Sequence, residues 1–267
     1  MILLLLFLGF LASVYGAIIG AGGGFLFVPI LLIFYEISPA EAAATGLAIV
    51  FINAISGLPT LLKQHRVFIR IGILISICAV PATFIGRILV KYSPVSIYYN
   101  LFACLLIGLG IFLIWKNHSN DKASLNITNP EISAALEEKT EAAHVNSPSI
   151  KTWKLIFIGF LLGIISSFFG IGGGWLLVPL LVYFFYLPMK EATATSIFSL
   201  ALYSLAGLLP SIADHSIDWF VIACSTPGII IGAQLGAMIS KKLNGLTIGR
   251  LLAAVVVIMG VGMFFQG

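Results

Sequence analysis

The sequence has 267 residues, of which 60% are hydrophobic and only 9% are charged, and its formal net charge is +4. Soluble domains carry about 25% charged residues, so this composition excludes a soluble globular protein and predicts an integral protein of the lipid bilayer. The small positive charge is typical of residues that flank membrane spans and does not suggest a nucleic-acid partner. The cysteines Cys78, Cys104 and Cys224 lie in apolar runs and match neither a disulfide framework nor a metal site.

The first apolar stretch, residues 2–35, is longer than the roughly 20 residues that one spanning helix needs. It is interrupted by Gly20, Gly22, Gly23 and Gly24, with Pro29 after them. Each glycine costs a helix about 1 kcal/mol relative to alanine, so the cluster predicts a broken helix at membrane depth. Whether the stretch crosses the bilayer once, crosses it twice, or enters as a re-entrant half-helix stays open.

The remaining chain alternates apolar and polar segments. Further apolar segments cover residues 42–62, 67–90 and 95–115, and a polar linker with a short helix near 131–143 is predicted for residues 116–152. The pattern then recurs at residues 154–187, 192–212, 217–240 and 246–265. We therefore predict an all-α polytopic membrane protein of about eight transmembrane helices. It would comprise a first repeat (residues 1–115), the linker (116–152) and a second repeat (153–267), each repeat beginning with a glycine-broken helix.

The doubling is visible residue by residue. Between residues 20–45 and 170–195, at an offset of 150, 13 of 26 positions are identical. The second copy supplies Gly170, Gly172, Gly173, Gly174 and Pro179. The third segments align at an offset of 146 instead, through Cys78 with Cys224, Pro81 with Pro227, and Gly86 with Gly232.

The basic residues give conflicting signals about orientation. Lys63, Arg66 and Arg70 precede the third segment of the first half, whereas Lys241, Lys242 and Arg250 follow the third segment of the second half. The positive-inside rule favours one side for both groups, which requires inverted halves and an odd number of crossings in each. Four clean crossings would give parallel halves, and both arrangements stay open.

The glycine clusters predict an anion site. The N–H groups at the end of a broken helix lack partners and present partial positive charge, so they bind anions without a cationic side chain. Transporters with internal repeats place substrates at such interruptions near the bilayer midplane. Close packing of helices through glycine is the structural alternative.

Polar residues in the second segments are the candidate donors to such an anion. Thr45, Asn53, Thr195 and Ser199 are the residues we select, with interhelical hydrogen bonds as an equally good interpretation.

Three charged or titratable features near the segment ends are better explained structurally. Glu41 belongs to a capping box and is interpreted as a helix-start residue. His65 and His215 are expected in interfacial turns, and Arg87 is expected to extend to the membrane surface.

The sequence contains no HExxH zinc motif, no GxSxG nucleophile elbow and no P-loop. We therefore predict a protein that is not an enzyme, with no catalytic residue, no metal ligand and no cofactor. Transport, if it occurs, would be secondary or passive.

The pattern resembles the sulfite exporter TauE/SafE family. The resemblance is carried by G-x-G-G-G-x4-P followed by Glu-Ala-x-Ala-Thr, found as Gly20–Pro29 with Glu41–Thr45 and as Gly170–Pro179 with Glu191–Thr195. It implies a multi-pass transporter of the bacterial cytoplasmic membrane that handles sulfite, organosulfonates or related sulfur oxyanions. These motifs indicate the family well and the substrate poorly.

Together these observations predict a secondary transporter of a small anion that works by alternating access between two halves. The alternatives are a passive anion channel and a non-transporting membrane partner protein that docks through residues 116–152. Assembly into a homo-oligomer is also left open.

Overall fold

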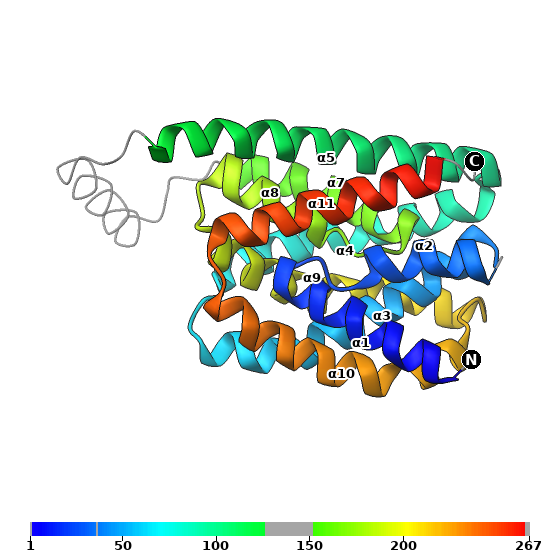
Figure 1. The fold of residues 1–267 in the computed structure, drawn as a ribbon. Helices are drawn as coiled ribbons and strands as arrows, with labels where there is room; N and C mark the ends of the chain where they lie inside the picture. The colour runs from blue at the N-terminus through cyan, green and yellow to red at the C-terminus, as the bar shows by residue number, and fades with distance from the viewer. Residues whose placement is uncertain (1, 36, 126–151, 265–267) are drawn as a thin grey trace.

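The computed structural model describes residues 2–35, 37–125 and 152–264, and these form helices and turns without strands (Figure 1). The helices of the first half are α1 (Ile2–Ile19), α2 (Gly24–Phe34), α3 (Pro39–Lys63), α4 (Ile69–Tyr92) and α5 (Val95–Leu125). Those of the second half are α7 (Thr152–Phe169), α8 (Gly174–Phe185), α9 (Met189–Ala213), α10 (Trp219–Lys242) and α11 (Gly245–Phe264). The predicted all-α class is confirmed for this part of the chain.

Six described helices are long and apolar enough to cross a membrane, namely α1, α3, α4, α9, α10 and the Val95–Phe112 part of α5. The chain is therefore a multi-pass membrane protein. Helix α2 has only 11 residues. At about 1.5 Å per residue it covers roughly half of a 30 Å hydrocarbon layer. Helix α5 continues past residue 115 to Leu125, while the short helix predicted near 131–143 lies outside the described residues.

Glycines bring helices of the two halves into close contact. A β-carbon on Gly232 of α10 would lie 2.5 Å from the Phe10 carbonyl oxygen of α1, and one on Gly236 would lie 2.5 Å from that of Val14. Residue numbers rise together along both helices, so α1 and α10 are parallel. Helices α4 and α7 are also parallel, with Gly159 against Ile75 and Gly163 against Ala79. Without side chains at these positions, the backbones can approach closely.

The same contacts correct the predicted alignment of the third segments. Gly86 of α4 faces the Ile164 carbonyl oxygen of α7, and Gly236 of α10 faces the Val14 carbonyl oxygen of α1. Gly86 therefore corresponds to Gly236, and Val14 corresponds to Ile164, each at an offset of 150 residues. The predicted offset of 146 is wrong by four residues. Four residues are about one turn of an α-helix, so both alignments place small residues on the same helix face. Sequence comparison alone therefore could not separate them.

The two halves run in opposite directions. Gln64, after α3, donates from Nε2 to the Ala237 carbonyl oxygen at 3.3 Å, so α4 begins beside the end of α10. Because α1 is parallel to α10 and α7 is parallel to α4, helices α1 and α7 are antiparallel, as Figure 1 shows.

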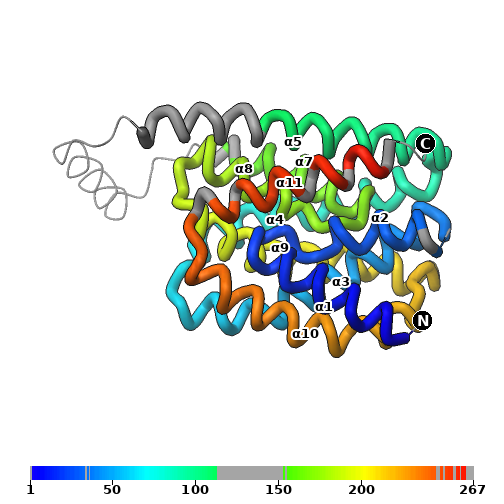
Figure 2. The backbone as a smooth tube through the Cα atoms, in the orientation of Figure 1, coloured from blue at the N-terminus to red at the C-terminus, as the bar shows by residue number. Residues whose placement is uncertain are grey.

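Residues 2–35 form a helical hairpin. The N–H groups of Gly20, Ala21 and Gly22 all donate to the Gly16 carbonyl oxygen, at 2.9, 2.9 and 3.2 Å, and the chain then turns back as α2 (Figure 2). Both ends of this hairpin lie on the same side of the molecule. The antiparallel directions of the two halves are the arrangement that the positive-inside rule favours.

We expect Gly46→Ala to destabilise the fold. A β-carbon at Gly46 would overlap the Val28 side chain and lie 2.7 Å from the Gly170 carbonyl oxygen. Overpacking of this kind costs about 1–3 kcal/mol, and the thermal unfolding midpoint of the detergent-purified protein should fall. Gly108→Ala is the control, because a β-carbon on Gly108 of α5 meets no atom within 4 Å. Equal midpoints for the two variants would contradict the close packing described here.

Candidate functional site

The two glycine turns, residues 20–24 and 170–174, meet in the interior. A β-carbon on Gly24 would lie 3.2 Å from the Gly170 carbonyl oxygen, and one on Gly174 would collide with the Gly20 carbonyl oxygen. Gly22 and Gly172 both face Val50 and Leu200. All these glycines are buried, so the structure brings together the two clusters that the sequence singles out.

The turns require glycine for conformational reasons as well. Five positions have left-handed φ angles that side-chain-bearing residues rarely adopt: Gly20 (82°), Gly22 (82°), Gly23 (77°), Gly170 (69°) and Gly172 (65°). This backbone ends α1 and α7 and reverses the chain, so the predicted helix breaks are confirmed. Pro29 and Pro179 lie buried inside α2 and α8.

Helices α2 and α8 begin at this meeting point. The N–H groups of Leu26 and Phe27 donate to the Gly23 carbonyl oxygen, whereas the preceding N–H groups of a first helical turn have no partner within the helix. The carbonyl ends of α1 and α7 are better satisfied, because Gly16 accepts three turn N–H groups and Ser166 accepts that of Gly170. At the start of α8 the Gly174 N–H donates to the Gly172 carbonyl oxygen.

Each turn faces a buried polar side chain at the equivalent position of its half, Asn53 in the first and Tyr203 in the second. Asn53 is 2% exposed, and its Nδ2 atom lies 3.0 Å from the β-carbon position of Gly23 and makes no hydrogen bond. Ser13 Oγ lies 3.0 Å from Asn53 Oδ1 and 2.7 Å from the Ile229 carbonyl oxygen, so its single hydrogen is shared between these two acceptors. An unsatisfied buried donor costs about 1–3 kcal/mol, so this one requires a functional or structural reason.

Tyr203 occupies the equivalent place in the second half, 150 residues later. It is fully buried, and its hydroxyl oxygen lies 3.2 Å from the β-carbon position of Gly173 without a hydrogen bond. It lies beside Ser166, whose Oγ atom is also buried and unpaired. In the first half Gly16 stands in place of Ser166. The two turns therefore have similar backbones and different donors, an amide in one half and hydroxyls in the other.

The other predicted donors make structural hydrogen bonds. Thr45 Oγ1 accepts from the Asp218 N–H at 3.1 Å, and Thr195 Oγ1 accepts from the Phe68 N–H at 3.0 Å. The Thr45 hydrogen bond thus connects α3 to the start of α10, and the Thr195 hydrogen bond connects α9 to the start of α4. Ser199 Oγ donates to the Thr195 carbonyl oxygen at 3.0 Å.

Besides Tyr203, two further residues at the turns were not selected from the sequence. One is Ser166, and the other is Ser196, whose Oγ donates to the Gly20 carbonyl oxygen at 2.8 Å. Their counterparts in the first half are Gly16 and Gly46, so the comparison of repeats gave no signal for either residue.

The side chains that line the turns are uncharged. The atoms nearest to the β-carbon positions of the glycines belong to alanine, valine, leucine, threonine, asparagine, tyrosine and glycine residues. Among the described residues, Arg87 is the only charged one that is buried, and no group of three or more histidine, cysteine, aspartate or glutamate residues there could hold a metal. The interior site therefore depends on neutral donors.

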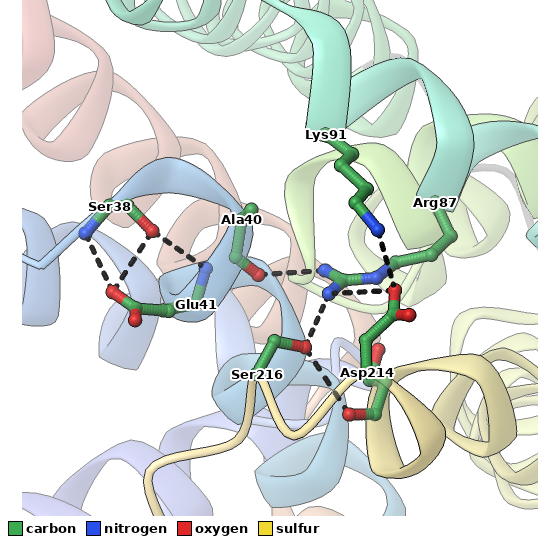
Figure 3. A network of polar contacts seen from close by, with 8 residues as sticks. Ser38, Ala40, Glu41, Arg87, Lys91, Asp214 and Ser216 are labelled. Carbon is green, nitrogen blue, oxygen red and sulfur yellow. Dashed lines mark hydrogen bonds and ion pairs between the residues drawn. The ribbon is translucent and has the colours of Figure 1, made fainter.

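Arg87 joins the two halves at one face of the molecule, as Figure 3 shows. It is 5% exposed and donates from Nη1 to the Ala40 carbonyl oxygen at 2.8 Å and from Nη2 to Ser216 Oγ. Its Nη2 atom is 3.9 Å from Asp214 Oδ2, and Lys91 Nζ lies 3.5 Å from the same oxygen. Arg87 therefore extends from α4 toward this face, but its guanidinium is buried against the turn after α9 instead of being exposed as predicted.

A cleft of about 230 Å³ lies at this face, lined by Ile37, Glu41, His215, Ser216, Ile217 and Asp218. The Glu41 carboxylate accepts from the Ser38 N–H at 3.2 Å and from Ser38 Oγ at 2.9 Å, which confirms the predicted capping box. His65 and His215 both occupy turns, with φ angles of 52° and 50°.

The opposite face is joined differently. Arg66 Nη1 donates to Gln64 Oε1 at 2.9 Å and to Ser240 Oγ at 3.5 Å, while its Nε and Nη2 atoms are buried without partners. Burial lowers the pKa of Arg66 from its usual value, and the Glu191 carboxylate works in the opposite direction. The Glu191 Oε2 atom is itself buried without a hydrogen-bond partner.

Known proteins resemble the chain over nearly its full length. The probable membrane transporter protein YunE of Bacillus subtilis is 28% identical over 274 residues, covering 99% of this chain and 97% of that protein. The probable membrane transporter protein MJ0441 of Methanocaldococcus jannaschii is 28% identical over 276 residues, covering 97% and 94%. No solved structure matches significantly. The family model described as Sulfite exporter TauE/SafE matches residues 5–263, and the chain belongs to this family of membrane transporters.

Proposed function

We propose that the protein is a secondary transporter of a small anion, namely sulfite, an organosulfonate or a related sulfur oxyanion, in the bacterial cytoplasmic membrane. The observation that carries the proposal is the pair of buried, unpaired donors, Asn53 Nδ2 and Tyr203 Oη, facing two glycine turns that meet in the interior. An oxyanion accepting hydrogen bonds from these groups would remove the cost of leaving them unsatisfied.

The turns pack against each other in this structure, so an anion can enter only if the halves separate. We propose that the two halves are inverted repeats, each made of one re-entrant hairpin and three crossings, that move relative to each other around the turns. The antiparallel α1 and α7 and the equivalent helix lengths support this arrangement. Transporters built from inverted repeats work by such rocking around a central site.

The Arg87 cluster would act as the closure of one face. Its hydrogen bonds and ion pair connect α4 of the first half to the turn after α9 of the second half. The opposite face has the unpaired Arg66 and Glu191 groups instead. The ion pair of Arg87 and Asp214 therefore holds the halves together at one face. At the other face, Arg66 and Glu191 have unpaired atoms that could form an ion pair in a second conformation.

The distribution of charge supports an orientation. Lys63, Arg66, Arg70, Lys190, Lys241 and Lys242 lie at the face where α3 and α10 end. Arg87 and Lys91 lie at the other face with Glu41, Asp214 and Asp218. By the positive-inside rule, the face with six cations is cytoplasmic.

The first test is transport by purified protein in proteoliposomes, using counterflow of labelled sulfite and methanesulfonate, since only a carrier exchanges. Tyr203→Phe should lower the exchange rate at least about tenfold, equivalent to about 1.4 kcal/mol, because it removes one donor. The same change should leave thermal stability unchanged or raised, because the hydroxyl is unsatisfied.

Tyr98→Phe is the matched control, because Tyr98 is equally buried and donates to the Phe169 carbonyl oxygen at 3.0 Å. It should lose about 1 kcal/mol of stability and keep full exchange. Counterflow by neither labelled anion would contradict the proposed transport, and leakage without exchange would indicate a channel.

The second test concerns the closure at Arg87. Arg87→Gln should reduce the free energy of unfolding by about 3 kcal/mol, because it leaves buried acceptors unpaired. Lys91→Gln should cost less than about 1 kcal/mol, since the Lys91 side chain is 54% exposed. If both variants unfold at the same denaturant concentration, Arg87 does not hold the halves together.

The third test concerns orientation. In a background with the three cysteines replaced by alanine, Lys91→Cys should react with a membrane-impermeant maleimide added to right-side-out spheroplasts. Lys242→Cys should react only after the membrane is permeabilised. The reverse labelling pattern would place the lysine-rich face outside.

A further inference from the structure

We propose that the site between the glycine turns is matched to an anion with a single negative charge, and that it discriminates against dianions. This inference rests on the proposed function and adds the charge state of the substrate.

The first argument is the absence of a countercharge at the turns. The residues that face the glycines are uncharged, and the unpaired donors are the Asn53 amide and the Tyr203 and Ser166 hydroxyls. Arg87, the buried cation of the described residues, is already held by Ala40, Ser216 and Asp214. Among the described residues, no charged side chain is therefore in contact with the glycine turns.

The second argument concerns the helix ends. The N-termini of α2 and α8 meet at the turns, and each is equivalent to about half a positive charge. Together they supply about one charge at most. The carbonyl groups at the C-terminal ends of α1 and α7 reduce this positive charge. Part of this reduction is offset, because the Gly16 and Ser166 carbonyl oxygens accept hydrogen bonds from turn amides and the Gly20 carbonyl oxygen accepts one from Ser196. By the same rule the C-termini of α1 and α7, which end at these turns, carry about half a negative charge each, so the backbone balances at most one negative charge and cannot balance two.

The third argument is desolvation. In a continuum description the cost of moving an ion out of water grows with the square of its charge, so a dianion costs about four times as much as a monoanion of equal size. Donors that carry no net charge recover only part of this cost. A sulfonate or hydrogensulfite therefore fits the site better than sulfate or fully ionised sulfite.

The experiment is competition against counterflow of labelled methanesulfonate in proteoliposomes. Unlabelled methanesulfonate should inhibit at least about tenfold more strongly than sulfate. Inhibition by sulfite should strengthen as the pH is lowered from mildly basic to mildly acidic, following the hydrogensulfite fraction, while inhibition by methanesulfonate should not change.

Asn53→Asp provides an isosteric second test, because it places a titratable carboxyl beside Gly23. Methanesulfonate exchange by this variant should be lost at neutral pH and should recover at lower pH, when the carboxyl is protonated. Asn244→Asp, at an exposed position of the turn between α10 and α11, is the control and should exchange at the original rate at both pH values.

The outcomes separate the two proposals. Equal inhibition by sulfate and methanesulfonate, or pH-independent exchange by Asn53→Asp, would overturn the charge selectivity and leave anion transport standing. Failure of the unmodified protein to exchange methanesulfonate or sulfite would overturn the proposed function itself.

Discussion

The close approach of two glycine backbones in the interior is the constraint on which the rest of the structure depends. A β-carbon on Gly174 would collide with the Gly20 carbonyl oxygen, and one on Gly24 would collide with Val50 and lie 3.2 Å from the Gly170 carbonyl oxygen. In a bilayer, the polar groups of such a turn must be satisfied by protein or by a ligand. The contact therefore holds the two hairpins together and concentrates hydrogen-bond donors at one place, where Asn53 and Tyr203 add two more.

Around this centre, the halves are tied in two different ways. The hydrogen bonds of Thr45 and Thr195 are reciprocal, each joining a long helix to the opposite half. The charged contacts are not reciprocal, because Arg87 finds Asp214 and Ser216 at one face while Arg66 keeps unpaired nitrogens at the other. A symmetrical framework with unsymmetrical contacts at the two faces would suit the proposed alternating access, in which the faces do not open together.

The outcome for individual residues shows where sequence reasoning succeeded. The breaks at Gly20–Gly24 and Gly170–Gly174 and the capping box at Glu41 are local, because they follow from glycine conformation and from a three-residue spacing. Arg87 was misjudged because its acceptors, Ala40 and Ser216, come from distant parts of the chain. Ser166 and Ser196 were not selected, because their counterparts in the other half are glycines and the comparison of the two repeats therefore showed no shared polar residue at these positions.

The sequence alone determined the membrane class, the doubled plan and the points at which the helices break, because composition, repeated motifs and glycine conformation act locally along the chain. Only the tertiary structure decided that residues 2–35 turn back as a hairpin, that the halves are inverted, and that the third segments correspond at an offset of 150. It also decided which buried donors lack partners. These features depend on which helices pack against each other. A shift of the alignment by one helical turn places almost the same residue types on each helix face, but it changes the residues that each face contacts.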